Sequence, residues 1–447
     1  MGRVLELLAG SVCYDSTEYF LDCIAAELSG RNVECRKVRL DKDDFEAGLK
    51  EFYGEEFDCI LTINTRVTCY DYLNKIKGPV YLYLLDHPLY HHDTLLSPLN
   101  DLHVICIDKE HVRYVKDNYS NIKDVRFIPL SVSPYPNYKP LSERKYGIVF
   151  SGSYTDPDLV RHQMDKISGK YGEGFNPFRV KGSKDNTREF LSGELYGMLT
   201  DGWLKIMLDN PSITQEEAMR QLLDSIDKDS STDGADLPNL SKLSEISDLP
   251  ELSDLSKLSR QLSSFTLREL LHDIFLADVY LHAMIRQEII LEFIRQKVDI
   301  ELFGHDWDIF IYKYEIVTGE KAATVTCHDE VSYSEMPAVY ADSKLVLNHL
   351  PLFRAGIHDR VPMALASGAL VLTESNPYMD ALRENASPLN LYETFSLEDM
   401  TDIPRKATEM LACAENVTME EQAHRAAYIN EHFSWKRWVD ELDIKNP

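Results

Sequence analysis

The sequence of 447 residues lacks a long apolar run, closely spaced cysteines and an excess of basic residues. No apolar stretch approaches the roughly 20 residues that cross a bilayer, so no membrane-spanning helix is expected. The eight cysteines include no C-x-x-C pair and mostly lie in apolar segments, as reduced core cysteines do. Glu6 interrupts the short apolar run near the first residue, which indicates a strand and not a signal peptide. The cytoplasm is therefore the expected compartment.

The charge balance is strongly acidic. Lys and Arg number 47 against 74 Asp and Glu, which gives a formal net charge of −27. This charge repels nucleic acid backbones and anionic membrane surfaces, so neither is expected as a partner. A nucleotide ligand would need a local cluster of donors. Arg354, His358 and Arg360 lie close together in the sequence and form such a cluster.

Apolar segments of strand length alternate with segments of helical spacing through much of the chain. This alternation predicts parallel sheets covered by helices on both faces, an α/β fold. The proline-bearing stretch 132–145 predicts an extended linker. We therefore expect a Rossmann-like domain at residues 1–131 and a second one at residues 146–447, joined by this linker.

The second domain is expected to carry a helical and low-complexity insert at about residues 160–297. Three segments of the chain in this region have helical spacing: 187–208, 214–226 and 266–296. A closing helix is expected at about 419–442, with Trp435 and Trp438 on a face suited to packing on the other domain.

Part of the insert repeats an aliphatic residue at every third position. The repeated residues are Leu237, Leu240, Leu243, Ile246, Leu249, Leu252, Leu255 and Leu258. A period of three suits neither a strand nor one face of an α-helix. We therefore expect a flexible segment at about 227–263 that is dispensable for catalysis. A docking strip for a partner is the alternative.

The stretch 345–373, LVLNHLPLFRAGIHDRVPMALASGALVLT, predicts strand, polar loop, short helix, glycine turn and strand. The start of a helix after a parallel strand is where α/β sheets bind phosphate, and His358 and Arg360 add cationic donors there. Gly368 stands where the helix end requires positive φ. The alternative is an ordinary surface turn, with Asp359 as the N-cap and Arg360 solvated.

Asp86 and His87 follow an apolar strand of the first domain, at the carboxyl edge of its sheet. An imidazole titrates near neutral pH, so His87 suits a general base toward a substrate hydroxyl. His91 and His92 are interpreted as a solvated loop. A zinc site formed with them lacks a further cysteine or carboxylate at ligand spacing.

The 345–373 stretch resembles the nucleotide-sugar site of bacterial GT-B glycosyltransferases of the CgeB-like and flagellin-glycosyltransferase-like group. The residues in register with its pattern are Asn348, Pro351, Phe353, Gly356, His358, Asp359, Arg360, Ala364 and Gly368. The segment at Asp86-His87-Pro88 is similar to one in the same group. One departure is that related family 4 enzymes carry two glutamates, where this chain has Ala355 and Met363.

The resemblance implies two Rossmann-like domains facing a cleft, with the acceptor on the first and the donor on the second. It implies transfer of a sugar from a nucleotide sugar, a UDP- or GDP-sugar, to a protein or glycan acceptor. The expected catalytic residues are His87 and Asp86. The turns at Gly10 and Gly152 would approach acceptor and diphosphate. The residues expected to bind the donor are Gly152, Ser153, Val331, Tyr333, Asn348, Gly356, His358, Asp359 and Arg360.

No metal and no cofactor are expected. The triplets Asp156/Asp158 and Asp306/Asp308 match the D-x-D metal site of the other glycosyltransferase fold, but such triplets arise by chance among 74 acidic residues. In a GT-B site the helix dipole and basic side chains neutralise the leaving diphosphate. Two alternatives to a transferase remain, a non-catalytic surface- or spore-associated binding protein of this fold and a nucleotide-sugar epimerase.

Overall fold

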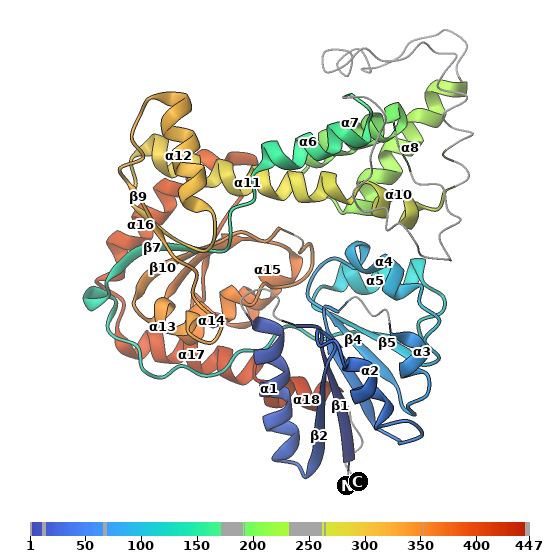
Figure 1. The fold of residues 1–447 in the computed structure, drawn as a ribbon. Coiled ribbons are helices and arrows are strands. Elements are labelled where there is room, and N and C mark those ends of the chain that lie inside the picture. Colours follow the sequence, from blue (N-terminus) through green and yellow to red (C-terminus); the bar gives the residue numbers. More distant parts are fainter. Residues whose placement is uncertain are drawn as a thin grey trace. The chain divides into compact units, whose positions relative to one another are not determined.

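The computed structural model describes residues 2–10, 15–65, 69–170, 191, 193–231, 262, 265–351 and 353–442. The chain divides into two compact units. Unit 1 comprises Met1–Tyr154 and Arg286–Pro447, and unit 2 comprises Thr155–Ile285. Unit 1 contains two six-stranded sheets, in which all neighbouring strands run parallel (Figure 1). Both predicted Rossmann-like domains are therefore confirmed as α/β folds.

The first sheet has the strand order β2-β1-β3-β4-β5-β6. Its strands are β1 (Gly2–Leu8), β2 (Val33–Arg39), β3 (Cys59–Ile63), β4 (Val80–Leu84), β5 (Leu102–Cys106) and β6 (Asp124–Phe127). Its helical segments are α1 (Ser16–Ser29), α2 (Phe45–Lys50), α3 (Tyr70–Leu73), η1 (Pro88–His91), α4 (His92–Leu95) and α5 (Lys109–Asn118). Every residue of β3 and β4 is buried, as expected of central strands covered on both faces.

The second sheet has the strand order β12-β11-β10-β7-β8-β9. Its strands are β7 (Tyr146–Ser151), β8 (Ile300–Phe303), β9 (Val325–His328), β10 (Ser343–Asn348), β11 (Leu370–Glu374) and β12 (Glu393–Phe395). The strand order reverses between β7 and β10. In open parallel sheets, ligands bind beyond the carboxyl ends of strands at such a reversal.

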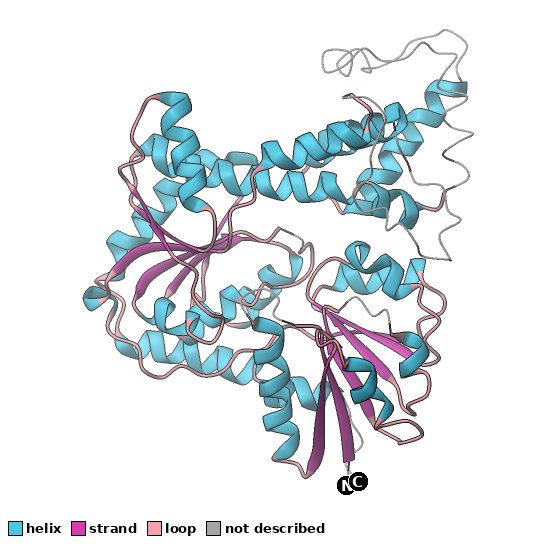
Figure 2. Cartoon of the chain, viewed as in Figure 1, coloured by secondary structure: helices cyan, strands magenta, loops and turns pink. Residues whose placement is uncertain are grey.

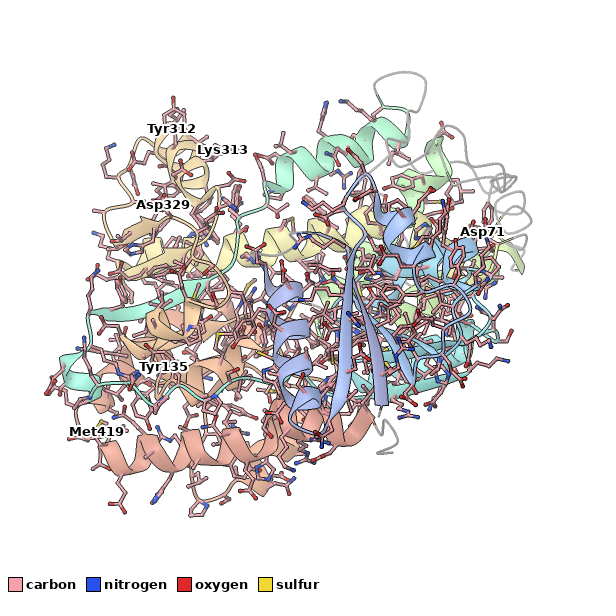
Figure 3. All side chains as sticks on the ribbon, turned by 60° about the horizontal axis from the view of Figure 1, so that its bottom comes forward. Asp71, Tyr135, Tyr312, Lys313, Asp329 and Met419 are labelled. Carbon is pink, nitrogen blue, oxygen red and sulfur yellow. The ribbon has the colours of Figure 1, made fainter. Side chains whose placement is uncertain are left out.

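Helices between and after these strands complete the second domain. They are α12 (Trp307–Thr318), α13 (Met336–Ala341), α14 (Arg360–Ala366), α15 (Pro377–Asn385), η4 (Leu397–Asp402), α16 (Ile403–Ala414), α17 (Met419–His432) and α18 (Trp435–Leu442). Gly368 follows α14 with φ +71°, as predicted. Helix α12 buries Trp307 and Phe310, whereas Tyr312 projects outward (Figure 3).

The linker between the sheets contains one short 3₁₀ turn, η2 (Leu141–Glu143). The predicted single closing helix is instead two, because the chain changes partners at Phe433. The backbone N–H of Val132, in the linker, donates to the Phe433 carbonyl at 2.8 Å. Beyond this break Trp435 packs on Phe20 and Trp438 on Tyr83, with ring centroids 5.4 and 5.2 Å apart. Both tryptophans thus pack on the first domain, as predicted.

The described elements of unit 2 are helices (Figure 2). They are α6 (Pro157–Ile167), α7 (Gly193–Asp209), α8 (Gln215–Ser231), α10 (Leu267–Asp273) and the first half of α11 (Phe275–Gln296). The prediction of one helix over 266–296 is wrong, since non-helical backbone at Ile274 separates α10 from α11. The leucine repeat from Leu237 to Leu258 lies outside the described residues. Among the described helices, none combines the length and apolarity needed to span a membrane.

Candidate active site

The turn after β7 forms the centre of the candidate site. Gly152 has φ +130°, in the region that favours glycine. A Cβ on Gly152 would lie 3.1 Å from Nη2 of Arg360 and 3.7 Å from Nη1 of Arg286. Gly304, in the turn after β8, has φ +144°, and a Cβ there would lie 2.6 Å from the Gly152 backbone. The two glycine turns therefore pack backbone to backbone, with two guanidinium groups beside them.

The two arginines come from distant parts of the sequence. Arg286 of α11 donates from Nη1 to the Ser153 carbonyl at 2.5 Å, and its guanidinium lies 6.0 Å from the Phe150 ring centroid. Arg360 is the first residue of α14. Within the described part of the chain, its buried Nη1 has no hydrogen-bond partner. Two adjacent cations, one with an unsatisfied buried donor, form a site suited to a multiply charged anion.

The segment directly before α14 contains a histidine paired with a carboxylate, His358 and Asp359. Asp359 is buried, pairs with Nδ1 of His358, and accepts a hydrogen bond from the Tyr333 hydroxyl at 2.6 Å. Burial acts to raise the pKa of Asp359, but His358, Arg360 and Tyr333 outweigh it and hold that pKa well below its usual range. Burial, followed by Arg360, lowers the pKa of His358, while Asp359 opposes this shift. The Arg360 N–H donates to the same Nδ1 at 3.3 Å, so the imidazole contacts both Asp359 and the first turn of α14.

Tyr333 connects this pair to the first domain. Its ring centroid lies 5.3 Å from that of Tyr19 and 4.8 Å from that of Phe20, both on α1. Burial, and then the Asp359 charge, raise the pKa of the Tyr333 hydroxyl, which stays protonated as a donor. Val331 is partly buried against the same core. The expected contacts of Val331 and Tyr333 with a nucleotide base stay predictions.

The loop before His358 packs closely on the first domain. Oδ2 of Asp108 accepts the Ala355 N–H at 2.7 Å, and the Lys109 N–H donates to the Ala355 carbonyl at 3.1 Å. A Cβ on Gly356 would lie 2.4 Å from the Ile107 carbonyl oxygen. Gly356 thus permits a close backbone approach between the two domains. Within the second domain, Asn376 also fixes this loop, because its Nδ2 donates to the Gly356 carbonyl at 2.9 Å.

Buried polar groups end β10 and β11 beside this loop. Nδ2 of Asn348 donates to Oγ1 of Thr373 at 2.9 Å. His349 and Glu374 form an ion pair with exposed side-chain fractions of 1% and 8%. The Leu350 N–H also donates to Glu374 at 3.1 Å. Sequence reasoning missed His349 and Glu374, although each lies at or next to a strand's carboxyl end.

The Asp86 and His87 pair lies on the first domain. Asp86 accepts from Nδ2 of Asn64 at 2.6 Å. His87 is only 2% exposed, and its Nδ1 accepts the Leu89 N–H at 3.1 Å, which caps the 3₁₀ turn η1. The interpretation of His91 and His92 as solvated is wrong. Both side chains are buried. Nε2 of His91 is hydrogen-bonded to Oδ1 of Asn64 at 3.0 Å, and Nδ1 of His92 to the Tyr119 hydroxyl at 2.9 Å.

The structure brings most of the expected donor residues into one cluster. Arg360 lies beside the turn of Gly152 and Ser153, His358 and Asp359 directly precede Arg360 in the chain, and Tyr333 contacts Asp359. A row of rings leads from this cluster to His87. The centroid separations along it are 5.6 Å from His358 to Phe353, 6.1 Å from Phe353 to His111 and 4.6 Å from His111 to His87. Throughout the described residues, no group of three or more His, Cys, Asp or Glu is arranged to hold a metal ion.

Comparisons with known proteins find that part of the second domain is similar to a described family. The model of glycosyl transferase-like proteins matches residues 286–443. The arginine cluster lies within this match, which begins at Arg286. A comparison with curated proteins finds no match.

Among solved structures, similar chains include HepE from Anabaena in complex with UDP, at 10% identity and a TM-score of 0.47, covering 99% of this chain and 98% of that one. Sucrose-phosphate synthase from Thermosynechococcus elongatus matches at 8% identity and 0.48, covering 99% and 97%. An alpha-glucosyltransferase in complex with UDP and a 13-mer DNA matches at 11% and 0.49, covering 99% and 98%. Over residues 286–443 the chain is therefore similar to glycosyl transferase-like proteins, and its two parallel sheets are Rossmann-like.

Proposed function

We propose that this protein is a glycosyltransferase, which moves a sugar from a nucleotide diphosphate donor to a protein or cell-surface glycan acceptor. The observation that carries the proposal is the buried Nη1 of Arg360, which has no hydrogen-bond partner among the described residues and lies beside Arg286 and the Gly152 turn. This arrangement suits a diphosphate, because guanidinium groups bind phosphate oxygens through paired hydrogen bonds. HepE has been crystallised with UDP and with UDP-glucose, which makes a UDP-sugar the first donor to test.

In the proposed reaction the bond between the anomeric carbon and the diphosphate breaks, and a bond from an acceptor oxygen forms. The departing diphosphate gains negative charge as its bond to the sugar breaks. Arg360 and Arg286 would stabilise that charge most strongly in the transition state, where it is greatest. Asp359 and His358 would fix the first turn of α14 and thereby position Arg360. The proton of the acceptor hydroxyl passes to a base, for which His87 or Asp86 is proposed.

The CgeB-like group is the proposed subfamily, and the reaction is proposed to need no metal or cofactor. The cytoplasm is the proposed compartment, on the basis of the cysteine pattern of the sequence. A binding protein without catalysis is the second candidate, because Ala355 and Met363 stand where related enzymes carry glutamates.

Donor turnover distinguishes these functions. Purified protein is incubated with UDP-glucose, UDP-N-acetylglucosamine, GDP-mannose and dTDP-glucose, and the products are separated by anion-exchange chromatography. A transferase releases the nucleoside diphosphate from one donor, slowly to water and faster when an acceptor is added. An epimeric nucleotide sugar would indicate an epimerase. Saturable nucleotide binding with no turnover, even with bacterial surface glycans or flagellin as acceptors, would favour the binding protein and contradict the proposal.

A further inference from the structure

A cavity lies away from the arginine cluster, at the amino end of β11. Its volume is about 430 Å³, within the range of small-molecule sites. The cavity lies among β11, β12, α16 and the start of α17, with Leu370 and Val371 of β11 in its wall. The same strand ends at Glu374, beside the candidate active site. The two sites are therefore at opposite ends of one strand.

The wall of this cavity combines apolar and charged side chains. Leu391, Met410 and Val417 supply apolar surface. Arg405 is engaged by two carboxylates, Asp402 at 2.6 Å and Glu409 at 2.5 Å. These pairs cancel most of the local charge, so Arg405 is not available to bind an anion.

Arg425 differs from these paired residues. Nε of Arg425 donates to the Leu389 carbonyl at 3.1 Å, which fixes the guanidinium at the cavity wall. The described part of the chain provides it with no ion pair. Glu421, one turn earlier on α17, is occupied in accepting the Thr418 N–H and hydroxyl at 2.7 and 3.0 Å. Arg425 is partly buried, and this burial lowers the pKa of its guanidinium, while the charge of Glu421 opposes the shift.

A partly desolvated cation without a paired anion is costly unless a ligand supplies the negative charge. Lys406 is engaged like Arg405, because its Nζ donates to the Thr394 carbonyl at 2.9 Å and lies 3.7 Å from Oδ2 of Asp402. The carboxylate of Glu393, also at the cavity, is exposed and therefore solvated. We propose that this cavity is a second ligand site for a small anionic molecule with an apolar body, whose charged group pairs with Arg425.

The test uses the full chain and phenyl phosphate as the probe, with benzyl alcohol as its neutral counterpart. Binding is measured by titration calorimetry. We expect saturable 1:1 binding of phenyl phosphate and at least about tenfold weaker binding of benzyl alcohol. Arg425→Gln should weaken phenyl phosphate at least about tenfold, and Arg425→Lys should retain part of the affinity. Equal affinity for the two probes, or no saturation, would overturn the proposal.

Two further variants separate this site from the diphosphate site and from simple misfolding. Arg360→Gln should leave the affinity for phenyl phosphate within twofold, and the exposed Arg437→Gln serves as the matched control. If Arg360→Gln abolishes binding and Arg425→Gln does not, the probe occupies the active site and the proposal fails. Met410→Trp fills the cavity while Arg425 remains, so it should also abolish binding. Wild-type affinity in Met410→Trp would overturn the proposal even if Arg425→Gln does not fold.

Discussion

At the scale of single residues, Arg360 is the most exacting test of the site. Arg360→Ala should weaken binding of UDP by about ten- to a hundredfold, because a charge-assisted bond is worth roughly 1.5–3 kcal/mol. Arg360→Lys should recover only part of the loss, since a point charge cannot form the paired bonds of a guanidinium. Titration calorimetry gives the affinities, and Arg437→Ala, on the exposed face of α18, is the control. If folded Arg360→Ala protein bound UDP with unchanged affinity, the diphosphate site would not be at Arg360.

Basic side chains at the diphosphate predict catalysis without a metal. Turnover of the preferred donor should be the same within about twofold after dialysis against EDTA, because Arg360 and Arg286 supply the charge that a divalent ion supplies elsewhere. The measurement is release of nucleoside diphosphate with EDTA, magnesium or manganese added. Activity lost in EDTA and restored by manganese would contradict this prediction and direct attention to Asp306 and Asp308.

The residue scale also shows what sequence reasoning could not reach. His358, Asp359 and Arg360 were found because they are adjacent in the chain and begin a helix after a strand. Arg286 was missed because it lies within a long helix, 133 positions from its partner Ser153, and nothing in its local pattern marks it. His349 and Glu374 were missed because a buried ion pair depends on which strands are neighbours, and period alone does not give strand order.

At the scale of elements, long periodic segments were predicted well and short ones poorly. The stretch 345–373 forms the predicted strand, loop, short helix and strand, which are β10, α14 and β11. The edge strands β6 and β12 have only four and three residues, and runs this short show no period in the sequence. The breaks at Ile274 and Phe433 were missed, and the one at Phe433 accompanies a tertiary contact, since its carbonyl accepts the Val132 N–H. The local sequence pattern therefore predicts which segments are strands and helices, whereas packing determines where the helices end.

Strand β1 carries a buried acid that makes its stability depend on pH. Glu6 is 1% exposed, and its Oε1 has no hydrogen-bond partner in the described part of the chain. Burial raises its pKa from 4.5 to about 7, although Lys37 opposes the shift. The folded state therefore holds a proton between these values that the unfolded state has lost, so stability falls as pH rises from 4.5 to 7.

Replacement of this acid by a neutral amide tests that linkage. Glu6→Gln should raise the free energy of unfolding by up to about 3 kcal/mol at pH 8 and change it little at pH 4.5. Urea unfolding at both pH values measures the difference, and Glu51→Gln, at an exposed position, is the control. Equal effects of Glu6→Gln at both pH values would show that the carboxyl group does not titrate in this way.

The loop at Gly356 sets how closely the backbones of the two domains approach. Gly356→Ala places a Cβ 2.4 Å from the Ile107 carbonyl oxygen, where backbone must move on both sides. We expect a loss of about 1–3 kcal/mol in stability and a larger fractional fall in turnover than in UDP affinity. Gly147→Ala is the matched control, because its nearest contact is Leu411 Cδ1 at 3.9 Å. Thermal unfolding measures the stability of both variants, and donor release measures their turnover. Equal values for Gly356→Ala and Gly147→Ala would contradict the expectation.

At the scale of the whole molecule, the last described helix packs against the first domain, although it follows the second domain in the sequence. Both sheets belong to one unit, although that unit is interrupted by the helices of Thr155–Ile285. Helix α18 returns to the first domain, where Arg31 of the turn after α1 pairs with Asp440 at 2.6 Å. The family match begins at Arg286, immediately after the helical unit. The two-sheet unit is thus built from segments on either side of the helical unit.

This organisation leads to the prediction that part of the added unit is dispensable. Replacing residues 227–263 with a short Gly/Ser linker should leave donor release within about twofold of wild type, because a change in loop length alters closure entropy only slowly. Excision of α7 is the contrasting deletion. It removes Trp203 and Tyr196, two fully buried side chains, and should abolish soluble folding. If the 227–263 deletion also lost its fold or its turnover, that segment would have to pack against the enzyme or bind a partner the reaction needs.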